Sequence, residues 1–195
     1  MGASAGILPA DAVPQTASLD RDTGGTLLEE IMFKQMKVTG LVMDPHSNTP
    51  ILVLKDIADD TTLPIWIGLL EATAIATELE KIQFPRPMTH DLIRTLFDRL
   101  EVKVERIEVC DLKNNTYYAL IHIRNGEQVS SIDSRPSDAI AIALRTNAPI
   151  FVKEEVISKY LKSDDLKLPF DEKNKEQWAD MLDRLDPSDF SKYKM

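Results

Sequence analysis

The chain has 195 residues, of which 43% are hydrophobic and 28% charged, so it can form one globular domain with a buried core. The net charge of -9 and the absence of a Lys/Arg-rich stripe exclude a broad electrostatic footprint on duplex DNA or RNA, so any nucleic acid would be contacted locally. No apolar run approaches the roughly 18 to 20 residues that span a bilayer, and the single cysteine, Cys110, excludes an internal disulfide and a multi-cysteine metal site.

Residues 1–25 are rich in Ala, Gly, Ser, Pro and Asp without periodicity, which predicts a disordered segment. This segment has neither a basic start nor a continuous apolar core and does not resemble a signal peptide. We therefore expect a cytoplasmic protein that does not act at a membrane.

The first predicted elements of the core are strands. Residues 36–44 and 50–56 alternate apolar and polar side chains around the turn-forming DPHSNTP, which predicts a hairpin. LPIWIG follows as a short third strand. LLEATAIATELEKI then has the three-and-four spacing of a helix, with the apolar positions Leu69, Leu70, Ala72, Ile75, Ala76, Leu79 and Ile82.

The segment FPRPMTHDLIRTLFDRL opens with two prolines that prevent helix continuation, and Thr89 is the predicted N-cap of a second helix. The apolar face of this helix consists of Leu92, Ile93, Leu96, Phe97 and Leu100. Three strands, VKVERIEVCD, TYYALIHIR and EQVSSID, follow, with turns at Asn114-Asn115 and Asn125-Gly126.

The last elements are a helix that runs from Ala139 to Asn147, a short strand IFV and a short helix EEVISKYL. An amphipathic helix is expected at 177–185 in the tail, with Trp178, Met181, Leu182 and Leu185 on its apolar side. Strands interrupted by helix pairs predict an α+β fold with a mixed, mostly antiparallel sheet packed with several helices.

Two short stretches echo each other. The sequence from Glu71, EATAIA, matches the sequence from Asp138, DAIAIA, except at the third position and in the Glu/Asp exchange, and each follows a short strand. Six residues are too few to prove a duplication. The echo nevertheless predicts one carboxylate at an equivalent place near the start of two buried helices.

The segment SIDSRPSDAIAIALR places charge directly before a buried run. Helix capping by Ser134 or Asp133, Pro136 in the first turn and Asp138 near the helix dipole explain most of it. Arg135 is not explained, because the dipole disfavours a cation there. It requires a carboxylate partner, a phosphate or open solvent, and the sequence leaves these alternatives open.

PRPMTHDL is the second dense polar segment. Arg86, His90 and Asp91 lie within six residues behind a rigid Pro-X-Pro turn. A histidine at a helix start tends to be neutral and could act as a base or a ligand, although a lone histidine is more often structural.

PIWIGLLEATAI, PRPMTHDLI and DSRPSDAIAIALRTNAPIFV together resemble the bifunctional nuclease (BFN) domain family, over roughly residues 33–160. The resemblance implies an α+β fold, a homo-oligomer and nuclease activity on DNA and RNA. We accordingly expect a disordered segment at 1–25, a BFN-like domain at 26–160 and a C-terminal extension at 161–195. The family often has Ala where this chain has Ser134, which argues against an essential role for that hydroxyl.

Phosphodiester hydrolysis needs an activated water and stabilisation of the phosphoryl charge. The candidate catalytic residues are Glu71, His90, Asp91, Arg135 and Asp138, and the candidate phosphate-binding residues are Arg86 and Ser137. A divalent Mg²⁺ or Mn²⁺ ion could be held by Glu71, Asp91 and Asp138, with Asp133 in reserve. The alternatives are a non-catalytic oligomeric binding or regulatory module, in which these residues form a structural network, and a sensor of a small anion that uses Arg86 and Arg135.

Overall fold

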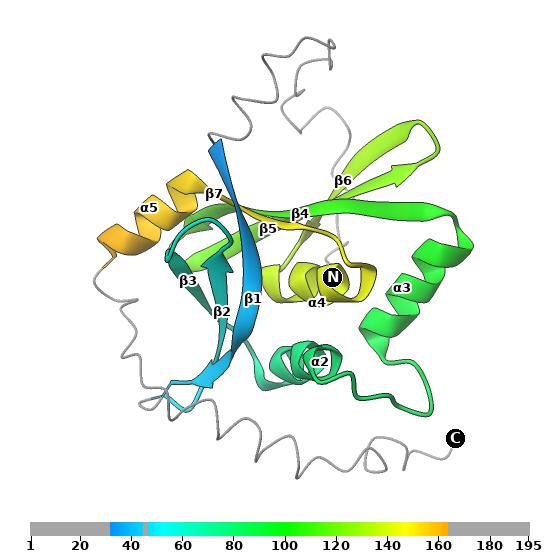
Figure 1. The fold of residues 1–195 in the computed structure, drawn as a ribbon, viewed down its shortest axis with the longest axis horizontal. Coiled ribbons are helices and arrows are strands. Elements are labelled where there is room, and N and C mark those ends of the chain that lie inside the picture. The colour runs from blue at the N-terminus through cyan, green and yellow to red at the C-terminus, as the bar shows by residue number, and fades with distance from the viewer. Residues whose placement is uncertain (1–31, 45–46, 164–195) are drawn as a thin grey trace, which may run out of the picture. The chain divides into compact units, whose positions relative to one another are not determined.

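The computed structural model describes residues 32–44 and 47–163, which form a seven-stranded sheet and four helices (Figure 1). The order of strands across the sheet is β3-β2-β1-β7-β4-β5-β6. The strands are β1 (Phe33–Met43), β2 (Pro50–Asp56), β3 (Thr62–Trp66), β4 (Val102–Lys113), β5 (Thr116–Asn125), β6 (Gln128–Ser134) and β7 (Ile150–Lys153).

Two antiparallel meanders, β1-β2-β3 and β4-β5-β6, are joined by β7. This short strand pairs antiparallel with β1 and parallel with β4, and β4–β7 is the one parallel pairing among the described strands. The predicted α+β class with a mixed, mostly antiparallel sheet is confirmed. The predicted hairpins at residues 36–56, 102–124 and 116–133 are confirmed as β1–β2, β4–β5 and β5–β6.

The helices are α2 (Leu69–Leu79), α3 (Thr89–Arg99), α4 (Pro136–Thr146) and α5 (Glu154–Lys162). Helix α4 is central, because it packs against α2 and α3 and lies on strands β4 and β5 (Figure 1). Its run Ala139–Ala143 is almost fully buried, so the small alanine side chains let neighbouring elements approach closely. None of the helices among the described residues has the length and apolarity needed to cross a bilayer.

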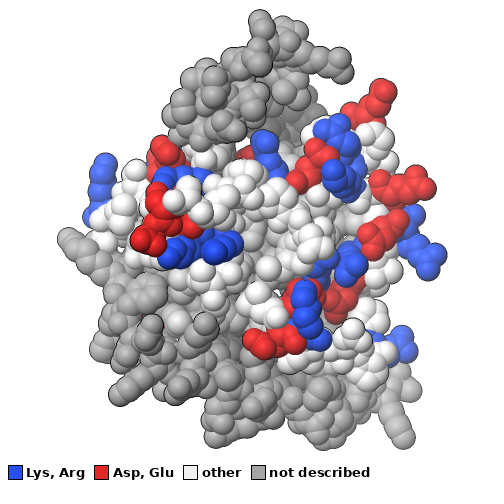
Figure 2. All heavy atoms as spheres, in the orientation of Figure 1, with Lys and Arg blue, Asp and Glu red and all other residues white. Residues whose placement is uncertain are grey.

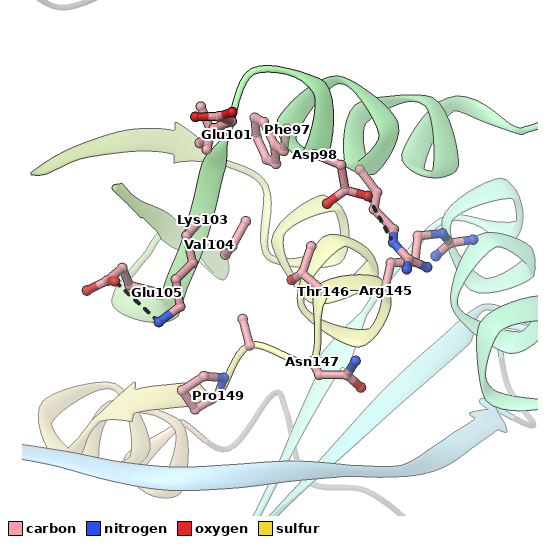
Figure 3. Close-up of a pocket in the computed structure, with 13 residues that line it drawn as sticks. Phe97, Asp98, Glu101, Lys103, Val104, Glu105, Arg145, Thr146, Asn147 and Pro149 are labelled. Atoms are coloured by element: carbon pink, nitrogen blue, oxygen red, sulfur yellow. Dashed lines mark ion pairs between the residues drawn. The ribbon is translucent and has the colours of Figure 1, made fainter. Parts of the chain in front are cut away.

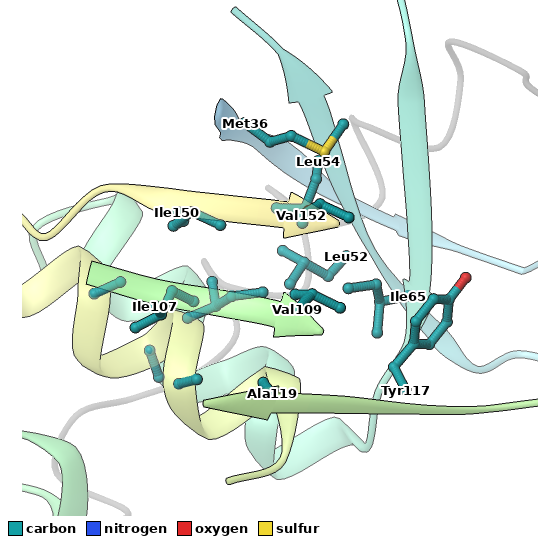
Figure 4. Packing of buried hydrophobic residues seen from close by; sticks show 14 of the residues in the cluster. Met36, Leu52, Leu54, Ile65, Ile107, Val109, Tyr117, Ala119, Ile150 and Val152 are labelled. Carbon is teal, nitrogen blue, oxygen red and sulfur yellow. The ribbon is translucent and has the colours of Figure 1, made fainter. Parts of the chain in front are cut away.

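Alternation with a period of two directs one face of the central strands toward the helices. The apolar pairs Ile107 and Val109 on β4, and Ile150 and Val152 on β7, are at most 6% exposed and form the centre of the core (Figure 4). Tyr117 lies at the edge of this core, and its hydroxyl donates a hydrogen bond to the carbonyl of Pro64 at 3.1 Å.

The turn chemistry agrees with the sequence. Asn114 and Asn115 have φ values of 49° and 58°, Gly126 has φ of 59°, and Asn147 ends α4 in the left-handed region at φ of 55°. These are the residue types that adopt positive φ at the lowest cost. The predicted turns and the predicted end of α4 are therefore confirmed.

Both predicted N-caps are wrong by one residue or more. Helix α3 begins at Thr89 with Met88 as its N-cap, and α4 begins at Pro136 with Arg135 as its N-cap. Arg135 is the N-cap of α4 because of Pro136. A residue that precedes proline is held in the extended region, so a helix that begins with Pro is capped by the residue before it. Ser134 and Asp133 are consequently part of β6.

The segment 1–25 and the tail helix expected at 177–185 lie outside the described residues, so both remain predictions from the sequence.

Candidate functional site

Three helices place a carboxylate at the same position. Glu71, Asp91 and Asp138 are each the third residue of their helices, α2, α3 and α4. At this position a carboxylate can reach back to the free N–H groups of the helix start and is favoured by the helix dipole. The equivalence that the echo between Glu71 and Asp138 predicted is confirmed, and Asp91 extends it to a third helix.

Arg135 joins two of these carboxylates. Its Nε and Nη2 atoms donate to the two oxygens of Asp138 at 2.7 and 3.1 Å, and its Nη1 donates to Glu71 Oε1 at 2.7 Å. The side chain of Arg135 is 64% exposed, whereas those of Glu71 and Asp138 are 20% and 29% exposed. The guanidinium therefore lies at the surface, above two partly buried acids. It links the start of α2 to the start of α4.

His90 is the second partner of Asp138. Its Nε2 lies 3.2 Å from Asp138 Oδ1, and its side chain is 13% exposed. Burial alone would raise the pKa of Asp138, but the hydrogen bonds from Arg135 and His90 outweigh burial and lower that pKa below its ordinary value. Asp138 is therefore ionised at neutral pH and is shared between a guanidinium and an imidazole. We call Glu71, His90, Arg135 and Asp138 the polar cluster.

Asp91 belongs to a separate set of contacts. Its Oδ1 accepts a hydrogen bond from Arg145 Nε at 2.6 Å, and its Oδ2 accepts one from the backbone N–H of Met88 at 2.9 Å. Burial would raise the pKa of Asp91, but the bonds from Arg145 and Met88 outweigh it and lower that pKa. Asp91 thus fixes the start of α3, the turn that carries His90.

Sequence reasoning missed Arg145. Its side chain is only 3% exposed, and its Nη1 also donates to the carbonyl of Ala141 at 3.1 Å. A basic residue in the last turn of a helix is ordinary, because it complements the dipole. The signal available in the sequence was that Arg145 lies seven residues, or two helical turns, after Asp138, and that residues 139–144 between them are all apolar.

The two candidate phosphate-binding residues are not joined to the cluster by contacts. Arg86 is exposed in the connection between α2 and α3, and Ser137 is buried in the first turn of α4. Within the described ranges neither side chain makes a hydrogen bond or an ion pair. Asp133, the reserve candidate, is exposed on β6.

The three candidate metal ligands do not form one metal site. No group of three or more His, Cys, Asp or Glu side chains in the described part of the chain is placed to hold a metal ion. The oxygens of Asp91 are bound by Arg145 and Met88, while Glu71 and Asp138 converge on the guanidinium of Arg135. The positive charge that a divalent ion would bring to these two acids is supplied here by an arginine.

The surface charges support only local contact with an anion. On the face shown in Figure 2, most basic side chains lie beside acidic ones, and no continuous basic tract forms. On this face, basic charge is therefore local and does not form a stripe.

A pocket of about 550 Å³ lies elsewhere, between the end of α3, the start of β4 and the end of α4 (Figure 3). Arg145 is at its wall, and the lining carries equal numbers of bases and acids, namely Arg94, Lys103 and Arg145 with Asp98, Glu101 and Glu105. None of the predicted site residues lines this pocket. The balanced charge of this lining gives the pocket no electrostatic preference for an anion.

Comparison with known proteins gives one family and relatives of two kinds. Residues 52–164 match the family model described as the bifunctional nuclease domain. An uncharacterized protein of Mycobacterium tuberculosis is 37% identical over 163 residues, which cover 80% of this chain and 97% of that protein.

The plant relatives carry the name of an activity. Bifunctional nuclease 1 of Arabidopsis thaliana is 31% identical over 126 residues, which cover 62% of this chain and 36% of that protein. Bifunctional nuclease 1 of Oryza sativa subsp. japonica is 29% identical over 115 residues, which cover 57% of this chain and 34% of that protein. The chain thus spans about a third of each of these two plant proteins.

Proposed function

The chain belongs to the bifunctional nuclease domain family, and from this premise we propose that it hydrolyses phosphodiester bonds of DNA or RNA at the polar cluster. The observation that carries the proposal is the surface guanidinium of Arg135, held by two carboxylates beside a histidine. Nucleic acid is the proposed substrate, contacted locally, and a homo-oligomer is the proposed assembly.

Arg135 is the proposed phosphate-binding group. Glu71 and Asp138 use three of its five N–H donors, and the second N–H of Nη1 and of Nη2 suits phosphate oxygens. A donor that is already oriented stabilises developing charge without reorganisation. Glu71 and Asp138 hold the guanidinium from below, while its exposed side is open to a ligand. Arg86, exposed on the loop that precedes α3, is proposed as a second phosphate contact.

His90 and Asp138 are the proposed acid–base pair. We assign the proton of Nε2 to the contact with Asp138, which makes Nδ1 the basic nitrogen that takes a proton from an attacking water. The ionised Asp138 stabilises the imidazolium that forms, and His90 can then return the proton to the leaving oxygen. Asp91 orients this pair through the start of α3 and takes no proton itself.

No step is assigned to a metal ion. Mg²⁺ or Mn²⁺ at Glu71 and Asp138 would have to displace Arg135 from the same oxygens. Arg135 already provides the electrostatic stabilisation that such an ion would bring to a phosphate.

A structural role for the polar cluster is the second candidate. Glu71, Asp138 and Asp91 are all paired with arginines of the same chain, as expected for a network that fixes three helix starts in a non-catalytic module. The 64% exposure of the Arg135 side chain favours the site, because an exposed guanidinium can be reached by a phosphate while Glu71 and Asp138 hold it in place.

The test is cleavage of single-stranded and duplex DNA and RNA by purified full-length protein, compared with a mock preparation. Arg135→Ala should lose about 10² to 10³-fold of the cleavage rate, the usual effect of removing one charge-stabilising donor. Arg94→Ala is the matched control, since Arg94 is 53% exposed and also pairs with a helical aspartate, Asp98. Equal cleavage by Arg135→Ala and wild type would refute the assigned site. Wild-type cleavage no greater than in the mock preparation would refute the proposed nuclease activity.

A further inference from the structure

Helix α3 and its C-cap, Leu100, expose a row of leucines. Leu92, Leu96 and Leu100 follow each other at intervals of four residues, and they are 49%, 50% and 63% exposed. Residues at this spacing lie one above the other on a helix. We call these three residues the leucine stripe.

The remaining apolar residues of α3 attach the helix to the domain. Ile93 and Phe97 pack against the hydrophobic core, and yet no residue of α3 is fully buried. A surface helix normally directs its whole apolar face toward the core. Here the face is split, and nothing within residues 32–44 and 47–163 covers its leucine half.

We propose that the C-terminal segment 178–185 forms an amphipathic helix that docks on the leucine stripe of its own chain. Its apolar residues, Trp178, Met181, Leu182 and Leu185, have the spacing of one helical face. Over a helix they extend about 10 Å, against about 12 Å for the leucine stripe, at about 1.5 Å per residue. The two rows therefore match in length.

The charges of the two surfaces are complementary. Residues 176–186 contain four acids, Glu176, Asp180, Asp183 and Asp186, and one base, Arg184, a net charge of -3. Arg99 borders the leucine stripe, because it lies three residues after Leu96 and seven after Leu92 on the same helix. A docked acidic helix would bring carboxylates to this arginine.

The tether favours the chain's own tail over a second copy. From Ser163, where the description ends, fifteen residues lead to Trp178, and an extended chain of that length reaches about 50 Å. This exceeds the roughly 36 Å diameter of a domain of this size. Three half-exposed leucines are far from the about 800 Å² per partner of a standard interface, whereas a tethered segment acts at an effective concentration near the millimolar range.

Disulfide trapping tests the contact directly. In the full chain with Cys110→Ser, Leu96→Cys and Met181→Cys are combined and oxidised mildly. The control combines Leu161→Cys with Met181→Cys, because Leu161 is 64% exposed on α5 and much closer to Met181 along the chain. Random encounter would favour the control pair, whereas docking predicts that the 96–181 pair closes faster and within one chain. Equal or faster closure of the control pair, or crosslinks mainly between chains, would overturn the proposal.

Trp178 gives a second readout that does not depend on cysteine chemistry. With Trp66→Phe as background, Trp178 is the one remaining tryptophan. Leu100→Asp should shift its emission to longer wavelength and raise its quenching by acrylamide, and Leu161→Asp, at an almost equally exposed leucine outside the stripe, should do neither. Unchanged Trp178 fluorescence in Leu100→Asp would contradict docking.

Discussion

Arg145→Ala should weaken the fold by removing a buried ion pair that ties the start of α3 to the far end of α4. The arginine is 3% exposed, and it donates to Asp91 at 2.6 Å and to the carbonyl of Ala141 at 3.1 Å. The substitution deletes both bonds and leaves Asp91 with the N–H of Met88 as its remaining partner. It also opens space beside the pocket that Arg145 lines.

The magnitude follows from the burial of the two partners. Breaking a fully buried pair from one side costs about 3 to 5 kcal/mol, but Asp91 is 35% exposed and can be hydrated after the change. A hydrogen bond to a charged group contributes about 1.5 to 3 kcal/mol. We therefore expect the free energy of unfolding to fall by about 2 to 3 kcal/mol, and Tm to fall by about 4 to 12 °C.

The assay is urea unfolding of full-length wild type, Arg145→Ala, Asp91→Asn and the double variant. The double-mutant cycle isolates the coupling between the two side chains. Arg94→Ala serves as the control, because Arg94 and Asp98 are 3.7 Å apart and more than half exposed, so its cost should stay within about 0.5 kcal/mol. A cost of Arg145→Ala as small as that of Arg94→Ala would refute the reasoning.

The coupling should depend on pH in one direction. The pKa of Asp91 in the fold lies below its ordinary value, because the bonds from Arg145 and Met88 outweigh burial. The stability it contributes is thus complete above the ordinary pKa of about 4 and is lost as the pH falls through the folded pKa. The difference between wild type and Arg145→Ala should shrink in that acidic range and stay constant near neutrality.

Three further changes probe other parts of the account. Gly68→Ala should fold normally but cleave more slowly. A Cβ at this position would lie 2.2 Å from Glu71 Oε2 and push this flexible carboxylate away from Arg135. Cleavage equal to wild type would show that Glu71 is dispensable. Tyr117→Phe should cost about 1 to 3 kcal/mol in urea unfolding, since the carbonyl of Pro64 loses its buried donor, and a neutral result would mean that water replaces the hydroxyl. Wild type should retain its cleavage in a chelator, because Arg135 supplies the charge; complete loss, with recovery on adding Mn²⁺, would mean that a metal replaces Arg135.

The strands and turns were the most predictable part of the fold. Alternation with a period of two identified the strands, and the residues Asn114-Asn115 and Asn125-Gly126 marked two of their turns, because both signals are local. The insertion of β7 between β1 and β4 was not predictable in this way. Its pairing with β1 joins segments more than 100 residues apart, and a four-residue strand carries no information about such a partner.

The sequence predicted which residues belong to the site better than it predicted which side chains they pair with. The echo placed Glu71 and Asp138 at equivalent helix starts, and the dipole argument showed that Arg135 needed an acid or a phosphate; the structure gives it two acids. The pairing of Asp91 with Arg145 was missed, because burial of an arginine in a last helical turn is decided by its neighbours in space. For the same reason, the sequence could not show that the apolar face of α3 is divided between the core and the leucine stripe.

The most direct test of the central claim is one comparison on Asp138→Asn, in which cleavage and the free energy of unfolding are measured on the same full-length preparation. A site in which the Asp138 carboxylate supports His90 and Arg135 predicts a loss of cleavage of about 10²-fold or more. The stability change should be about 1 kcal/mol or less, because the ion-pair partner of Asp138, Arg135, is 64% exposed. A structural network predicts the opposite result, in which cleavage is unchanged and the free energy of unfolding falls. Wild-type cleavage together with a loss of several kcal/mol of stability would contradict the proposed active site.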